Sequence, residues 1–143
     1  MTLTITRLSP TVPMPAYATE GAAAFDLAAS ADVVVPPHAI ALVPTGLVVA
    51  VPAGHFLAIL ARSSTPLKRG LMVANGMGVV DSDYCGPADE VKIQVINVTD
   101  LPVRVAAGDR LAQGMVLAAP RVTFEEVAAT GKASRGGFGS TGR

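Results

Sequence analysis

Short runs of β-branched and other apolar residues, each closed by proline, glycine or a polar turn, dominate this sequence. The runs cover residues 2–8, 33–35, 39–43, 46–51, 56–61, 91–98, 103–105, 110–117 and 122–127. Runs of this length are typical of strands, and many short strands at close spacing indicate a sandwich or a barrel. Only 64–70 favours a helix, with Ser64 or Thr65 as the N-cap and Pro66 in the first turn. We therefore expect one all-β domain over residues 1–143, with at most one short helix.

The composition limits both the core and the partners of this domain. Half of the 143 residues are apolar but only 4% are aromatic, so the core must be built from Val, Ala, Leu and Ile. This apolar fraction is high for a small domain, and part of it could cover a subunit interface. The 11 basic and 11 acidic residues cancel, which leaves no electrostatic footprint for nucleic acid.

Cysteine and histidine are too few for a disulfide or a structural zinc site. Cys85 is the single cysteine, and His38 and His55 lie in unrelated segments. Residues 1–10 carry no apolar signal core, and no apolar run approaches the ~18 residues of a membrane span. We expect a protein of the reducing cytoplasm that uses no membrane.

Residues 61–68 form the first segment with chemical potential. Arg62, Ser63 and Ser64 join a predicted strand to the predicted helix start. Backbone donors, hydroxyls and a guanidinium at such a junction are suited to phosphate. Taken alone, the segment is also what an ordinary strand end looks like.

Residues 75–86 form the second segment. It contains an amide, two glycines, two valines and a carboxylate, namely Asn75, Gly76, Gly78, Val79, Val80 and Asp81. The amide could bind a base edge, the glycines allow close approach, and the valines would form an apolar wall. A carboxylate beyond that wall could hold and activate a water. The alternative is a plain β-hairpin with a polar turn at Ser82-Asp83.

Two isolated polar residues and the C-terminus complete the set. Gln113 lies in an apolar strand, so it is either paired internally or aimed at a ligand. Asp26 needs a partner if buried, and Arg62 is available. Residues 130–143, TGKASRGGFGSTGR, are usually read as a flexible tail, yet glycine lets a backbone wrap phosphate, with Arg135 and Phe138 adding charge and a stacking face.

Together these segments resemble the trimeric dUTPase family. Five motifs occur in the family's order, at 24–27, 62–63 with Lys68, 78–84, 108–113 and 136–142. The third and fifth are highly specific. The resemblance implies a jelly-roll-like β fold, a homotrimer whose active sites are shared between subunits, and Mg²⁺ held mainly by the substrate phosphates. It also implies hydrolysis of dUTP to dUMP and pyrophosphate, which limits uracil in DNA and supplies dUMP for dTMP synthesis.

The resemblance also assigns roles to residues. Asp81 would be the catalytic base for the attacking water. Asp26 would hold Arg62 in position without contacting the substrate itself. The remaining residues would bind the substrate. The phosphates would be bound by Arg62, Ser63, Ser64 and Gln113, and the uracil by Asn75, Gly78, Val79 and Val80. Tyr84 would contact the deoxyribose, Lys92 would contact an unspecified part, and Arg135 and Phe138 would bind from a closing C-terminal arm.

The sequence departs from the family pattern at four places. Ser64 stands where many relatives have glycine, and Cys85 replaces a frequent Arg or Gln. Pro87-Ala88 resembles a small insertion. In the last motif Ala133 occupies the usual arginine position, so either Arg135 or Lys132 is expected to reach the phosphates.

Three rival functions remain. A dCTP deaminase of the same fold would need a glutamate where this chain has Gln94, and a neutral amide cannot shuttle the proton. A non-catalytic nucleotide-binding trimer would bind dUTP without turnover, against which Asp81 argues. A general nucleotide pyrophosphatase would need a tolerant base pocket.

Overall fold

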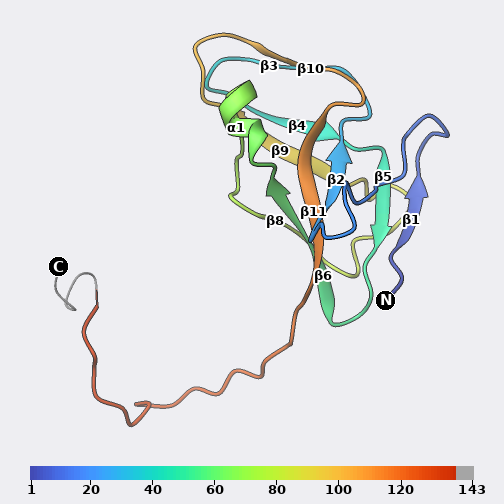
Figure 1. Ribbon diagram of the computed structural model, residues 1–143. Helices are drawn as coiled ribbons and strands as arrows, with labels where there is room; N and C mark the ends of the chain where they lie inside the picture. Colours follow the sequence, from blue (N-terminus) through green and yellow to red (C-terminus); the bar gives the residue numbers. More distant parts are fainter. Residues whose placement is uncertain (138–143) are drawn as a thin grey trace.

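Two antiparallel sheets form the body of the protein in the computed structural model, which describes residues 1–137 (Figure 1). The larger sheet has the order β2 (Phe25–Ala28), β11 (Arg110–Ala118), β6 (His55–Ala61) and β8 (Gly78–Val80), and the smaller has the order β4 (Ile40–Pro44), β9 (Lys92–Asn97) and β7 (Leu71–Val73). Two further ribbons pair β1 (Thr4–Arg7) with β5 (Leu47–Ala50) and β3 (Val33–Val35) with β10 (Val103–Val105).

The core lies between the sheets and consists of aliphatic side chains. Leu27 and Leu57 of the larger sheet and Val43 and Ile93 of the smaller one are fully buried in the same cluster. Burial alternates along β2 and β9, as it must when one face of a strand packs inward and the other does not. The expected all-β, jelly-roll-like class is confirmed. No helix of the described chain is long and apolar enough to cross a membrane.

One helix, α1 (Ser64–Arg69), follows β6 and is the helix that the sequence predicts. Its N-cap is Ser63, one residue earlier than expected, and the Ser63 side chain makes no capping bond. The expected cap at Thr65 is wrong because the buried Thr65 hydroxyl instead donates to the Leu111 carbonyl at 2.7 Å. Gly70 ends the helix in the left-handed conformation, with its N–H bonded to the Pro66 carbonyl.

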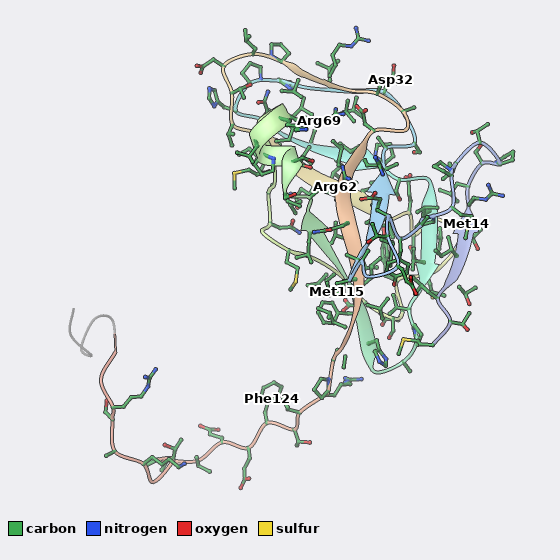
Figure 2. The ribbon with its side chains drawn as sticks, viewed as in Figure 1. Met14, Asp32, Arg62, Arg69, Met115 and Phe124 are labelled. Carbon is green, nitrogen blue, oxygen red and sulfur yellow. The ribbon has the colours of Figure 1, made fainter. Side chains whose placement is uncertain are left out.

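The predicted strand at 122–127 is not formed. After β11 the chain runs away from the body as an extended segment, and every side chain from 121 to 137 is exposed (Figures 1 and 2). Phe124 is 92% exposed. Its β-branched and aromatic residues make the segment capable of pairing, but within residues 1–137 no strand lies beside it, and an unpaired extended chain is not a strand.

The region 71–84 also differs from a simple hairpin. The expected turn at Ser82-Asp83 is present, closed by the Tyr84 N–H on the Asp81 carbonyl at 3.2 Å. However, β8 pairs with β6, and the chain after the turn enters β9 in the other sheet. The residues 78–84 therefore cross from one sheet to the other instead of folding back on themselves.

A close approach in the larger sheet gives a test of this packing. A methyl group added to Gly114 of β11 would lie 2.5 Å and 2.7 Å from two ring carbons of the buried Phe25. We expect Gly114→Ala to lower the free energy of unfolding by about 1–3 kcal/mol through overpacking, as measured by chemical denaturation. Gly21→Ala, where nothing lies within 4 Å of the added carbon, is the matched control. Equal stability of the two variants would contradict the packing.

Candidate functional site

Strand β11 assembles the first half of the site by pairing on both sides. Its register sets Gln113 opposite Asp26 of β2, and Ala112 opposite Ala61 of β6. Arg62 follows Ala61 directly and lies near α1 (Figure 2). The register therefore brings Asp26, Gln113 and Arg62 together at this end of the sheet.

A β-bulge adds Arg110 to this group. The register of β11 against β2 shifts between Arg110, which pairs with Ala28, and Ala112, which pairs with Leu27. Strict alternation would give Arg110 the inward orientation of the buried Ala112; the extra residue turns it to the outer side, where Asp26 and Gln113 also lie.

The carboxylate of Asp26 holds two guanidinium groups at once. Arg62 Nε lies 2.7 Å from Asp26 Oδ1, so the contact expected from the sequence is made. Arg110 Nη1 donates to Asp26 Oδ2 at 2.9 Å, and Arg62 Nη1 donates to the Arg110 carbonyl at 3.4 Å. The cluster of Asp26, Arg62 and Arg110 thus carries one net positive charge, from two cations and one anion, and that is suited to a phosphate ligand.

The predicted phosphate-binding neighbours lie around this cluster. Ser63 is exposed and Ser64 half-buried at the start of α1. The Gln113 side-chain nitrogen donates to the Ala61 carbonyl at 3.1 Å. An amide has two N–H groups, so Gln113 is both anchored internally and left with one donor for a ligand.

A second ion pair fixes the far end of α1. Arg69 Nη1 lies 2.6 Å from Asp109 Oδ2, which also accepts the Ala106 N–H at 2.9 Å. The hydrogen bond from Arg69 is the main reason that the pKa of Asp109 lies below its ordinary value, with the attraction of the same charge and the Ala106 bond adding to it. Since Asp109 precedes Arg110, this turn is tied to both ends of the segment 62–69.

The second half of the site is a cavity at the other end of β8, lined from β8, from the loop before β9 and from the outer faces of β4 and β9. It has a volume of about 400 Å³ and brings together five of the predicted residues, Val79, Val80, Asp81, Tyr84 and Lys92, with Leu42, Glu90 and Val91. Tyr84 is held by its hydroxyl, which donates to the Glu90 carbonyl at 3.3 Å. Lys92 Nζ lies 3.9 Å from Glu90 Oε2, and Glu90 Oε1 accepts the Gly46 N–H at 2.8 Å.

The remaining residues of this half lie around the turn that precedes β8. Asn75 is exposed in that turn and does not line the cavity. Gly76 adopts φ +72°, which favours glycine. A carbon added to Gly78 would lie 3.0 Å from Ile59 Cβ, so this glycine is needed for packing β8 against β6. In the insertion after the turn, Asp89 Oδ2 accepts the Gly86 N–H at 2.7 Å and closes a compact loop.

The C-terminal candidates are not brought to either half. Arg135 is exposed on the extended segment that leaves the body, as is Lys132 (Figure 1). Phe138 lies outside the described residues.

The two halves of the site lie at opposite ends of β6. Val80 pairs with Leu57, so Asp81 is level with Phe56, six residues before Arg62. At about 3.3 Å per residue these backbone positions are about 20 Å apart. Within one subunit, the backbones of Asp81 and Arg62 therefore lie far apart along β6.

Sequence reasoning missed Arg110, Arg69, Asp109 and Glu90. The bulge that re-aims Arg110 leaves no sequence signal. Arg69 and Asp109 are 40 residues apart, and only the basic residues in the last turn of α1 hint at an acidic partner. Glu90 acts partly through its backbone carbonyl, which every residue has.

The lowered pKa of Asp109 predicts how stability depends on pH. A carboxylate with a depressed pKa stabilises the fold above its unfolded value of about 3.9, and this stabilisation is lost as pH falls through the folded value. We expect Asp109→Asn to lower stability by about 1 kcal/mol at pH 7 and to match the wild type near pH 2 in thermal unfolding. Asp100→Asn is the control, because the Asp100 side chain is 97% exposed and that of its partner His38 is 64% exposed. This substitution should change the stability little. If the Asp109→Asn variant remained less stable than the wild type near pH 2, the stabilising role of the ion pair would be refuted.

The sequence and the fold of this chain are similar to those of known proteins. A dUTPase family profile matches residues 11–142. The deoxyuridine 5'-triphosphate nucleotidohydrolase of Caulobacter vibrioides is 44% identical over 138 residues, covering 92% of this chain and 86% of that protein. The crystal structure of dUTPase from Streptococcus mutans has a TM-score of 0.78 at 31% identity, covering 85% and 98%. The Staphylococcus bacteriophage 80alpha dUTPase with dUPNHPP shares the fold, with a TM-score of 0.87 at 23% identity and 99% coverage of both chains. The chain belongs to the dUTPase family.

Proposed function

We propose that this protein hydrolyses dUTP to dUMP and pyrophosphate, which limits uracil in DNA and supplies dUMP for dTMP synthesis. The observation that carries the proposal is Asp81, a carboxylate at the mouth of a cavity that also presents Tyr84 and Lys92. Membership of the dUTPase family supports the same reaction.

In this mechanism Asp81 orients the attacking water and takes its proton. Its side chain is exposed, and it lines both the cavity with Tyr84 and a neighbouring depression with His55 and Arg121. A carboxylate placed in this way can accept a proton from a water held in line with the α-phosphorus. The leaving group is then pyrophosphate, which needs positive charge around it.

The cluster at Asp26 would supply that charge. Arg62 and the free N–H of Gln113 would bind the phosphates, and Ser63 and Ser64 would add hydroxyl and backbone donors at the start of α1. Bound Mg²⁺ would spread the developing negative charge over the phosphate oxygens. The described residues include no group of three or more His, Cys, Asp or Glu able to hold a metal. We propose that the ion would be held mainly by the substrate phosphates, because Mg²⁺ keeps several waters and commonly binds through phosphate oxygens.

Base and sugar would be recognised in the cavity and at the turn before β8. Asn75 and the backbone from Gly78 to Val80 would bind the uracil edge. The Tyr84 ring, anchored through its hydroxyl on Glu90, would pack against the deoxyribose. A ribose hydroxyl buried there without a partner would cost about 1–3 kcal/mol. Phe138, with Arg135 or Lys132, would close over the bound nucleotide from the C-terminal segment.

We infer that the active site is shared between subunits of a homotrimer. The wide separation of the Asp81 and Arg62 backbones along β6 supports a site that takes these two residues from different subunits. The outer face of the smaller sheet offers a contact surface, because Ile40, Ile96 and Met72 form one apolar row across β4, β9 and β7. Ile40 is 57% and Met72 47% exposed, and the cavity borders this face through Leu42 and Lys92.

A reducing cytoplasmic setting suits a chain with the single cysteine Cys85.

Replacing the proposed base tests the mechanism directly. We expect Asp81→Asn to reduce pyrophosphate release from dUTP with Mg²⁺ by at least ~100-fold, as is typical when a general base is removed. Asp83→Asn, which changes the neighbouring exposed acid, should stay within about threefold of the wild type. A change under threefold in Asp81→Asn would refute the assigned role. Ammonia release from dCTP by the wild type would favour a deaminase instead.

Mixing two inactive chains tests the shared site. We expect Asp81→Asn and Arg62→Gln each to be inactive, and refolding them together to restore up to about a quarter of the wild-type activity, because random mixing pairs intact Asp81 with intact Arg62 in that share of sites. Sedimentation should give the mass of a trimer. A mixture no more active than its components would show that each site belongs to one chain.

A further inference from the structure

The two oxygens of Asp26 are divided between two arginines. Oδ1 lies 2.7 Å from Arg62 Nε in an ion pair, and Oδ2 accepts from Arg110 Nη1 at 2.9 Å. The Asp26 side chain is only 16% exposed, whereas that of Arg110 is 57% exposed. The carboxylate is therefore mostly desolvated between its two cations, and Arg110 lies on the solvent side.

The pairing of the two Asp26 oxygens with different arginines determines how much of the positive charge of Arg62 remains available for a phosphate ligand. A carboxylate facing a single arginine tends to bind it through both oxygens, which occupies two N–H groups and cancels its charge. Here Arg110 donates to the second oxygen, while Arg62 forms an ion pair with the first through Nε. Among residues 1–137, Nη2 of Arg62 has no protein hydrogen bond. That nitrogen stays free, and the cluster keeps one net positive charge.

We propose that Arg110 is a positioning residue that keeps Arg62 able to bind the substrate's phosphates. It does so through Asp26, by holding the oxygen that would otherwise neutralise Arg62. The Arg110 carbonyl, which accepts from Arg62 Nη1 at 3.4 Å, adds a second restraint on the same guanidinium. The inference rests on the proposed dUTP hydrolysis.

Two variants in the full-length chain separate charge from structure. Arg110→Gln should raise the KM for dUTP about tenfold, the cost of weakening one charged hydrogen bond to a ligand, with kcat within about threefold because Asp81 is unaffected. Arg110→Lys keeps a cation near Oδ2 and should hold KM within about threefold of the wild type. A KM for Arg110→Gln equal to the wild type, or no rescue by lysine, would overturn the proposal.

A double-mutant cycle distinguishes action through Asp26 from direct contact with phosphate. In an Asp26→Asn background the residue at 26 carries no charge to neutralise Arg62, so adding Arg110→Gln should weaken binding by less than about threefold. The readout is the Kd for dUPNHPP by calorimetry, which stays measurable even where turnover is slow. A tenfold loss that persists in that background would mean that Arg110 binds phosphate itself, and would overturn the positioning role.

Two controls keep the outcome interpretable. Thermal unfolding of each variant establishes that it is folded, and Arg110→Met, which retains the apolar stem, replaces Arg110→Gln if the latter is unstable. Wild-type turnover of dUTP is measured first. No turnover would contradict the proposed function, whereas normal wild-type turnover with unchanged Arg110→Gln and Arg110→Met would contradict this inference alone.

Discussion

The paired position of β11, hydrogen-bonded to β2 on one side and β6 on the other, is the constraint on which the phosphate half of the site depends. It fixes Gln113 against Asp26 and delivers Arg62 to the same end of the sheet. A slip of one residue would turn Gln113 inward and bring apolar neighbours outward, which the buried face of the strand forbids. The geometry of three charged groups is thus maintained by the packing of aliphatic side chains some distance from them.

Much of this arrangement could be predicted from the sequence, because it depends on local patterns. Runs closed by proline and glycine are sufficient to indicate an all-β chain, and Ser64 to Gly70 carries helix start and stop residues at the right spacing. The contact between Asp26 and Arg62 was predictable because a mostly buried carboxylate needs a cation, and Arg62 was an available partner.

What could not be predicted depends on pairing partners and on irregularities in the ladder. The β-branched and aromatic residues at 122–127 show only that the segment could join a sheet, and within residues 1–137 it pairs with no sheet edge. The bulge before Ala112 reverses the face of the sheet on which Arg110 lies. The residues around Arg110 do not predict the extra residue. The ion pair of Arg69 and Asp109 joins two turns that only the tertiary fold brings together.

The exposed segment after β11 has a consequence for how the protein is made. Val122 and Phe124 project from a backbone whose N–H and C=O groups have no ladder partner in the described chain. Such an edge is ready to accept any strand that it meets. A newly synthesised subunit is consequently prone to aggregation as long as these apolar side chains remain uncovered.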